Sequence, residues 1–416
     1  MHGGGLSVMR VYCRQTLGSA FLVGGTAIGA GMLALPLVTG AGGFLCSVLT
    51  LLFVFLFMLA SLFFLLEATL MTEGTNANLI SMCKQRLGRV GAFIAWGSFL
   101  LLLYSVAAAY LSGGGSLISN MMKSFFHLSI SANCGIVIFL FIFGSIVVFE
   151  TKAVDLINRV CMIGLISSFI FLCIFVSPQI KIDHYRGGDP QFLWVAIPVI
   201  ILSFTSHIIV PSLCGYLSGN IAKLKRALLL GSIIPLVFYL VWECVIIGML
   251  PPSGHHSLES IGRAVHPVAR LIDVLNVILD MPWIAAVVGF FSFFALATSF
   301  FGVALSLYDF LSDGLSIKKT IKGKVSLLLF MFTPPLFFAL FYPNGFVVAL
   351  SYAGIFVAIL YGILPILIVW HGRYIARRVV GFRVAGGKPF LLLIFLGSLA
   401  VIILQVAAAR GWLPMP

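Results

Sequence analysis

Apolar residues recur along the whole chain in long stretches, and the short segments between them carry most of the charge. A helix of about 20 apolar residues is long enough to cross the hydrocarbon core of a bilayer. Eleven stretches reach or approach this length, at 16–38, 43–66, 90–118, 133–149, 154–177, 192–217, 227–250, 282–308, 325–342, 345–370 and 389–409. The pattern predicts an all-α integral membrane protein with eleven transmembrane helices.

The composition supports this interpretation and excludes several classes of protein. The chain is 61% hydrophobic and only 9% charged, whereas about a quarter of the residues of a soluble domain are charged. We therefore expect a single membrane domain over residues 1–416, with the lipid bilayer as its surroundings. The net charge of +13 lies in short loops and not on a folded basic module, so nucleic acid is not an expected partner.

Sequence motifs of catalysis, metal binding and nucleotide binding are absent from the chain. The eight cysteines form no CxxC pair, and neither HExxH, GxSxG nor a P-loop occurs. Cysteines without such spacing predict neither a zinc site nor a disulfide framework. We expect no enzyme activity, no cofactor and no firm metal site, so any active transport has to draw on an ion gradient.

Basic residues are distributed unevenly over the two sides of the predicted topology. If the N-terminus is cytoplasmic, the inner segments hold 19 of the 25 Lys and Arg residues and the outer segments hold 6. Short cytoplasmic loops of membrane proteins are enriched in Lys and Arg. The asymmetry predicts a cytoplasmic N-terminus and, after eleven spans, a C-terminus outside.

The first ten spans divide into two halves of five. Because each half has an odd number of crossings, the second half enters the membrane from the opposite side, which is the arrangement of an inverted repeat. We expect one repeat over about 16–177, a second over about 192–370, and an extra C-terminal span at 389–409.

The first span of each half is interrupted near its middle. Residues 25–36 read "GTAIGAGMLALP", and residues 202–217 read "LSFTSHIIVPSLCGYL". Glycine and proline weaken a helix, and a broken helix in a membrane is tolerated where it lines a cavity. Gly25 and Gly29 alone would also suit a close helix–helix contact. The polar break at the corresponding place of the second half favours a binding site of a transporter.

The loop between the seventh and eighth spans carries its own apolar pattern. Apolar residues alternate at spacings of three and four from Leu258 to Leu279, which predicts an amphipathic helix. Such a helix would either lie on the membrane surface or cover the outer entrance to the site.

Four segments resemble the signatures of a known family. "GGTAIGAGMLALP" (24–36), "HIIVPSL" (207–213), "ATSFFGVALSLYDFLSDGL" (297–315) and "YAGIFVAILYGILP" (352–365) resemble spans 1, 6, 8 and 10 of the bacterial hydroxy and aromatic amino acid permeases. The tyrosine-specific members are most similar, followed by tryptophan permeases. The resemblance implies the five-plus-five inverted-repeat amino acid transporter fold and cation-coupled uptake across the bacterial cytoplasmic membrane, with protons as the usual cation.

An amino acid zwitterion needs acceptors for its ammonium and donors for its carboxylate, and the ends of broken helices supply both. We expect the carboxylate at the amides of Gly29, Ala30 and Gly31. The ammonium is expected at carbonyls near Thr26, Ala27, Ser203 and Phe204. Phe204 is also a candidate for stacking on an aromatic substrate, and the Tyr104 hydroxyl for reaching the carboxylate. Ser206 and His207 complete the predicted substrate-binding set.

Candidates for ion coupling lie within the spans. His207 and Glu243 are intramembrane ionisable residues, which are functional candidates by default, although a neutral core histidine and a solvated glutamate are the alternatives. In sodium-coupled relatives of the fold, hydroxyls of span 8 and carbonyls of span 1 hold sodium. The corresponding residues here are Thr298, Ser299, Gly25 and Ile28. The sequence thus predicts a proton-coupled importer of aromatic amino acids; the alternatives are tryptophan preference, sodium coupling, or a channel or sensor on this scaffold.

Overall fold

The computed structural model describes residues 3–29, 31–72, 78–149, 151–251, 254–279, 282–315, 320–342, 345–378 and 380–414, and every regular element within these ranges is helical. The α-helices are α1 (Gly3–Ala27), α2 (Gly31–Thr39), α3 (Phe44–Leu70), α4 (Leu79–Phe126), α5 (Ala132–Phe139), α6 (Ser145–Phe149), α7 (Thr151–Val176), α8 (Leu193–Ser203), α9 (Val210–Tyr216), α10 (Ile221–Met249), α11 (Leu258–Gly262), α12 (Pro267–Leu279), α13 (Pro282–Gly314), α14 (Ile321–Phe341), α15 (Gly345–Val357), α16 (Leu364–Trp370) and α17 (Gly387–Ala409). Short 3₁₀ turns lie at Gly40–Gly42, Ser177–Gln179, Ile182–Tyr185, Pro190–Phe192 and His207–Ile209, and π-helical turns at Leu140–Gly144, Ala358–Ile363 and His371–Ile375.

The prediction of an all-helical protein that crosses the membrane several times is confirmed. Within the described ranges, nine helical segments are long and apolar enough to span a bilayer, and α1 with α2 forms a tenth span bent by 56°. The predicted span 133–149 corresponds to the shorter apolar segment Ala132–Val147. The number of candidate spans is therefore nine or ten, and the eleventh span and the inverted repeat stay predictions.

The helix α4 is longer than the span predicted at 90–118. It begins at Leu79, where the Asn78 side chain caps it by accepting a hydrogen bond from the Ser81 amide at 2.9 Å. The chain turns at Gly88, whose φ of 72° is a conformation that glycine adopts without strain. The predicted span thus matches the part of α4 that follows this kink.

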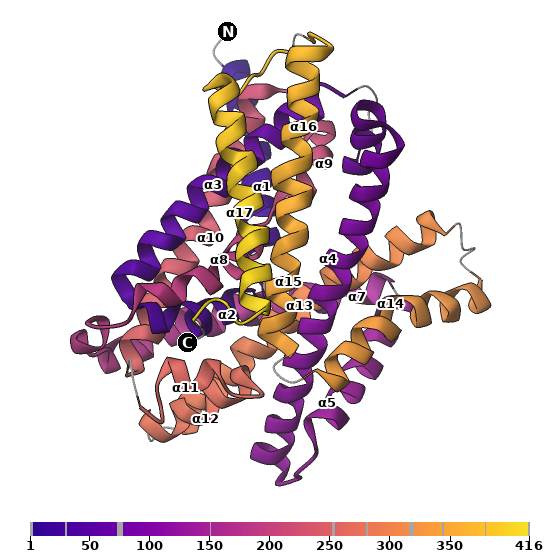
Figure 1. Ribbon diagram of the computed structural model, residues 1–416. Coiled ribbons are helices and arrows are strands. Elements are labelled where there is room, and N and C mark those ends of the chain that lie inside the picture. The colour runs from indigo at the N-terminus through magenta and orange to yellow at the C-terminus, as the bar shows by residue number, and fades with distance from the viewer. Residues whose placement is uncertain are drawn as a thin grey trace.

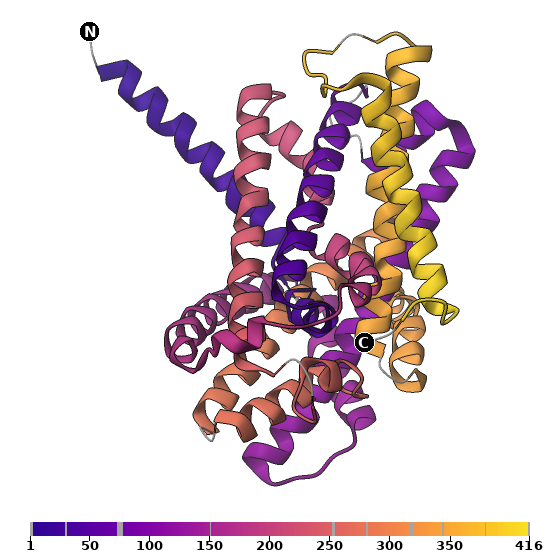
Figure 2. The ribbon, with the colours of Figure 1, turned by 60° about the vertical axis from the view of Figure 1, so that its left-hand side comes forward.

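The two chain ends lie at different heights of the molecule, the N-terminus at the top and the C-terminus below the middle of the view (Figure 1). The N-terminus is at the end where α3 finishes, whereas α17 runs away from that end to the C-terminus. A second view shows α1 leaning outward from the bundle toward the N-terminus (Figure 2). The helices α11 and α12 lie at the end remote from the N-terminus, where α5 also lies.

The prediction of a single amphipathic helix over 258–279 is wrong, because the structure has two helices there. α11 ends at Gly262, and α12 begins at Pro267, a residue that readily starts a helix but cannot continue one. α11 packs on α2, and α12 packs against α4 and α13. Of the residues in the predicted apolar stripe, Leu258 and Val268 are buried, whereas Val265 in the break is 56% exposed. We call these two helices the cover.

A buried ion pair joins three segments at the end of the molecule where α3 finishes. Glu67 on α3 accepts hydrogen bonds from Arg373 Nε and Nη2 at 2.6 and 2.5 Å. The Val384 amide, in the loop before α17, donates to the same carboxylate at 2.8 Å. Glu67 therefore anchors the loop before α17 to the bundle.

Candidate functional site: two broken helices beside a central cavity

The first broken helix consists of α1 and α2. α1 ends at Ala27 and α2 begins at Gly31, and the two axes differ by 56°. The predicted contact of a carboxylate at Ala30 falls outside the described residues. The Ile28 amide still bonds to the Gly24 carbonyl, and the Met32 amide bonds to the Gly29 carbonyl at 3.0 Å. The Ala27 carbonyl, in contrast, has lost its partner in the helix.

The second broken helix consists of α8 and α9. α8 ends at Ser203, residues 204–206 are not helical, and a 3₁₀ turn leads into α9 at Val210. The Ser203 hydroxyl donates to the Val199 carbonyl at 2.9 Å, and the Thr205 hydroxyl donates to Ile201 at 2.9 Å. The polar side chains of this break are thus partly satisfied within their own helix.

The two breaks lie against each other and against α13. A Cβ atom added to Gly31 would stand 2.8 Å from the Ser203 hydroxyl oxygen, and one added to Gly29 would overlap the hydroxyl of Ser299. Only glycine allows the main chain to approach these side chains so closely. The interruptions that the sequence placed 170 residues apart therefore meet in one place.

Tyr239 on α10 connects the two breaks. Its hydroxyl oxygen lies 2.7 Å from the Ala27 carbonyl oxygen and 2.7 Å from the Ser203 carbonyl oxygen. These carbonyls end α1 and α8, and the tyrosine side chain is completely buried. Because a hydroxyl has one proton, Tyr239 donates to only one of the two carbonyls at a time. The other carbonyl can accept a second donor.

A cavity of about 350 Å³ opens beside the breaks. Among the residues that the structure describes, its lining contains hydroxyls, one amide, main-chain groups and apolar side chains, but no Asp, Glu, Lys, Arg or His. The lining residues are Gly25, Thr26, Ala27, Ile28, Gly29, Gly31, Phe99, Leu102, Leu103, Val106, Tyr110, Asn158, Met162, Leu202, Ser203, Thr205, Ile208, Thr298, Ser299, Gly302, Val303, Ser306 and Tyr361. The volume falls within the range of small-molecule sites.

The cavity extends from the breaks toward one end of the bundle. On α4 its lining runs from Tyr110 back to Phe99, and on α13 it runs forward from Thr298 to Ser306. The start of α4 and the end of α13 lie together, because the Phe99 and Phe310 rings are 5.0 Å apart. This is the end that carries the basic segment before residue 90.

Many predicted site residues line this cavity. They are Thr26, Ala27, Gly29, Gly31 and Ser203 from the substrate-binding set, and Gly25, Ile28, Thr298 and Ser299 from the candidate sodium set. Thr298 donates to the Phe294 and Ala295 carbonyls, and Ser299 donates to Ala295 at 2.7 Å. Both hydroxyls thus bond back to carbonyls of their own helix.

Other predicted residues do not reach the cavity. Tyr104 faces α14, where its hydroxyl donates to the Phe330 carbonyl at 2.7 Å. The Phe204 ring packs on Phe55 and Tyr239, with centroids 5.7 and 5.1 Å away. Ser206, His207 and Glu243 are buried behind the lining.

His207 forms a chain of polar contacts behind the second break. Its Nε2 lies 3.2 Å from the Ser61 hydroxyl, which donates its proton to the Tyr361 carbonyl. Because that proton is used, we assign the proton of the imidazole to Nε2, which donates to Ser61. The ring also stacks on Tyr361, with centroids 4.9 Å apart. The break is thereby tied to α3 and to the π-helical turn Ala358–Ile363, a type of turn common at functional sites.

Glu243 lies one helical turn beyond Tyr239 on α10 and is completely buried. Thr39, at the end of α2, lies close to both carboxyl oxygens, with its hydroxyl oxygen 2.8 Å from Oε1 and 3.0 Å from Oε2. The Glu243 side chain therefore contacts the second half of the first broken helix and not the cavity.

Three tyrosines at the site were not predicted. Tyr110 and Tyr361 line the cavity, and Tyr239 bridges the breaks. For Tyr110 a signal existed, because Phe99, Leu103, Val106 and Tyr110 follow each other at spacings of three and four and so share one face of α4. Tyr104 does not belong to that face.

Comparisons with known proteins agree with this architecture. The model of the tryptophan/tyrosine permease family matches residues 13–405. Tyrosine-specific transport systems 2 and 1 of Haemophilus influenzae are 35% and 34% identical over 403 residues, which cover 96% of this chain and 98% of each relative. A tryptophan-specific transport protein of the same organism is 29% identical over 408 residues, 95% of this chain and 96% of the relative.

Proposed function

Since the chain belongs to the tryptophan/tyrosine permease family, whose members are transporters and not enzymes, we propose that it imports tyrosine by proton symport. The central cavity is the single observation that carries this proposal. It joins the ends of two broken helices to an apolar wall, and the described residues of its lining carry no formal charge. A zwitterion with an aromatic side chain needs such a combination, because its two charges cancel and its ring requires apolar contact.

The binding mode follows from the groups at the breaks. The ammonium of the substrate donates to the Ala27 and Ser203 carbonyls, sharing them with the Tyr239 hydroxyl. The carboxylate lies at the start of α2, where free amides and the positive end of the helix dipole favour an anion. The ring extends along the apolar stripe of α4 that contains Phe99 and Val106.

The proposed architecture is one transporter domain with an inverted repeat. Repeat one covers about 16–177, repeat two about 192–370, and the span 389–409 is additional. Two observations support it: the breaks occur in the first span of each half, and α17 runs away from the end of the molecule at which the N-terminus lies (Figure 2).

The proposed orientation places the N-terminus in the cytoplasm of a bacterium and the C-terminus outside the inner membrane. The excess of Lys and Arg in the corresponding segments supports it. In that orientation the central cavity faces the cytoplasm and the cover of α11 and α12 faces outward. The structure then corresponds to the inward-facing state of an alternating-access cycle.

The decisive experiment measures accumulation in vesicles. A tyrosine zwitterion carries no net charge, so symport with one cation moves one charge inward. A potential contributes roughly 2.3 kcal/mol per charge per 100 mV, which sustains on the order of fifty-fold accumulation. We expect vesicles with an inside-negative potential to concentrate tyrosine in sodium-free buffer and to lose it when a protonophore is added.

Other outcomes would replace parts of the proposal. A requirement for added sodium would assign coupling to the site formed by Gly25, Ile28, Thr298 and Ser299. Equilibration without accumulation would indicate a channel or sensor. Competition by all twenty amino acids in the same vesicles separates tyrosine from tryptophan preference.

A further inference from the structure

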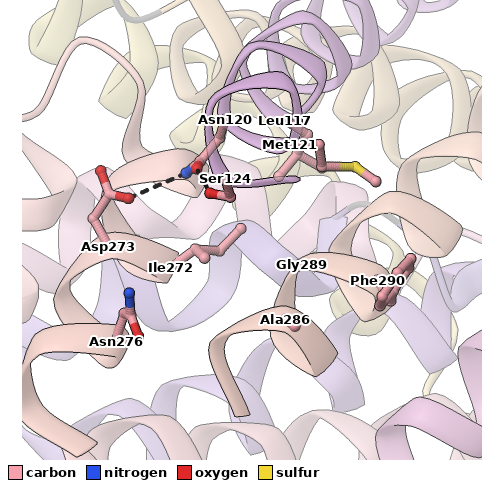
Figure 3. A pocket seen from close by; sticks show the side chains of 10 residues that line it. All are labelled: Leu117, Asn120, Met121, Ser124, Ile272, Asp273, Asn276, Ala286, Gly289 and Phe290. Atoms are coloured by element: carbon pink, nitrogen blue, oxygen red, sulfur yellow. Dashed lines mark hydrogen bonds between the residues drawn. The ribbon is translucent and has the colours of Figure 1, made fainter. Parts of the chain in front are cut away.

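We propose that the chain has a second ligand site, between the cover and the start of α13, for a molecule that combines a primary ammonium with an apolar body. A cavity of about 320 Å³ lies there between α4, α12 and α13 (Figure 3). It is lined by Leu117, Asn120, Met121, Ser124, Ile272, Asp273, Asn276, Ala286, Gly289 and Phe290. None of these residues lines the central cavity.

The charge of this second cavity selects a cation. Asp273 supplies a carboxylate, and the described lining residues include no Lys, Arg or His. The carboxylate accepts a hydrogen bond from the Asn120 amide at 3.2 Å, so a neutral group is its partner. An anionic carboxylate that faces a cavity beside a neutral amide favours an ammonium ligand.

The polar groups are already oriented toward one side of the cavity. The Ser124 hydroxyl donates to Asn120 Oδ1 at 3.2 Å, and Asn120 Nδ2 also lies 3.4 Å from the Ala269 carbonyl. These contacts hold the Asn120 amide against Asp273. Figure 3 shows Asn276 on the same side, one turn of α12 from Asp273. An ammonium has three N–H donors, and this side offers it the Asp273 carboxylate.

The opposite side of the cavity is apolar. Leu117 and Met121 come from α4, Ile272 from α12 and Phe290 from α13. An aromatic or aliphatic body attached to the ammonium gains contact with these side chains, whereas a bare inorganic cation does not. The site therefore fits an amphipathic amine better than a metal ion.

A ligand bound in this second cavity would affect the position of the cover. The Asn120–Asp273 hydrogen bond joins the α4 and α12 side chains. A ligand that contacts α4, α12 and α13 at once stabilises the arrangement of these helices described here. In the orientation of the proposed function, such a ligand keeps the outer side closed, so it lowers the maximal rate of uptake without raising the substrate concentration needed for half-maximal rate.

Two kinds of molecule combine a primary ammonium with an apolar body: a free aromatic amine and a lipid with an ethanolamine headgroup. The test uses the purified full-length protein with radiolabelled tyramine as the probe and 3-(4-hydroxyphenyl)propionate as the probe without an ammonium. We expect tyramine to bind and the propionate not to bind. Asp273→Asn should weaken tyramine binding about tenfold, and Ser124→Trp, which fills the cavity and retains the charge, should weaken it as well.

Two matched variants separate this site from the rest of the molecule. Asp183→Asn removes an exposed carboxylate between α7 and α8, where it pairs with Arg186, and should leave tyramine binding unchanged. Gly31→Val obstructs the central site, where tyramine can also bind, and should retain the tyramine binding that Asp273→Asn weakens. Equal tyramine binding in Gly31→Val and in the double variant with Asp273→Asn, or complete loss of binding in Gly31→Val, overturns the proposal, whatever the outcome of the accumulation experiment.

The lipid source is tested in nanodiscs. If phosphatidylethanolamine reduces tyramine binding relative to phosphatidylcholine, and Asp273→Asn removes that difference, the headgroup is the occupant of the site. If both lipids give equal tyramine binding, the occupant is a free amine. If phosphatidylethanolamine reduces binding equally in wild type and Asp273→Asn, the site assignment is wrong.

Discussion

The break between α1 and α2 is made of main chain, whereas the break between α8 and α9 is made of side chains. Gly29 and Gly31 bring bare backbone to the centre of the molecule, and a Cβ atom at either position would collide with a serine. Ser203, Thr205 and His207 fill the second break with polar groups, and the two hydroxyls and the His207 Nε2 atom already have partners.

Because one break exposes main chain and the other is filled by side chains, the two breaks have different roles in recognition. Every amino acid carries the same ammonium and carboxylate, and main-chain groups at helix ends recognise these without regard to the side chain. The second break is held in shape by side chains that reach α3 and the π-helical turn at Ala358–Ile363. Tyr239 joins the two, because its hydroxyl lies between one carbonyl of each. Substitutions in the first break should therefore have larger effects than those in the second.

Gly31→Val should cause the largest loss. The added Cβ would lie 2.8 Å from the Ser203 hydroxyl oxygen, and the branched side chain would occupy the space of the substrate carboxylate. We expect tyrosine uptake to fall by more than about 100-fold while the amount of protein in the membrane stays normal. Gly18→Val on α1 is the matched control, since a Cβ there meets nothing within 4 Å. Near-normal uptake by Gly31→Val would remove the main-chain site from this break.

Tyr239→Phe should have the second largest effect, because it removes the one donor shared by the two breaks. Both the Ala27 and the Ser203 carbonyls then lack a protein partner, at a cost of about 1–3 kcal/mol for a buried polar group. We expect uptake to fall about 10- to 100-fold. Tyr185→Phe is the control. The Tyr185 hydroxyl donates to the carbonyl of Cys244, which lies on α10 as Tyr239 does but is remote from the cavity. Equal effects of the two variants would mean that the bridge has no role in transport.

His207→Ala should lower uptake by about tenfold, since the loss of a buried hydrogen bond costs roughly 1–2 kcal/mol. Ser61→Ala should resemble it if His207 acts through Ser61, and His207→Gln should recover part of the activity, because its amide can still donate. Uptake measured from pH 5.5 to 8 distinguishes support of the break from proton transfer. An altered pH profile in His207→Gln indicates proton transfer, and an unchanged one indicates support.

Ser203→Ala should have the smallest effect, less than about threefold, because its hydroxyl donates within its own helix and the ligand contact is assigned to its carbonyl. Initial rates over a range of tyrosine concentrations test this. A loss as large as that of Gly31→Val would show that the side chain itself binds the substrate, and the contrast between the breaks would then disappear.

The sequence predicted those features that depend on local chemistry. Helix-breaking residues at Gly29, Gly31 and Pro211 marked both interruptions, because glycine and proline act on their own segment of chain. The choice of Tyr104 instead of Tyr110 shows the limit of this reasoning, since six residues along a helix rotate a side chain to a different face. Tyr239 had no local signal, because its partners are carbonyls of two other spans.

The cover shows the same limit of sequence-based prediction for a longer segment. The apolar periodicity from 258 to 279 marked buried helical residues such as Leu258, Ile261 and Val268, but it did not reveal the break before Pro267, in which Val265 is exposed. Packing of α11 on α2 and of α12 on α4 decides the two directions. Such tertiary contacts are not visible in the spacing of one segment.

The pair of contacts from α10 to the first broken helix has a mechanical consequence. Tyr239 and Glu243 are four residues apart, so they project from one face of α10. One contacts the carbonyl of Ala27, the last residue of α1, and the other contacts the hydroxyl of Thr39, the last residue of α2. Both parts of the first broken helix are therefore attached to the same face of α10. While both contacts persist, the end of α1 and the end of α2 cannot move apart, so a change of the angle between α1 and α2 requires one of the two contacts to break.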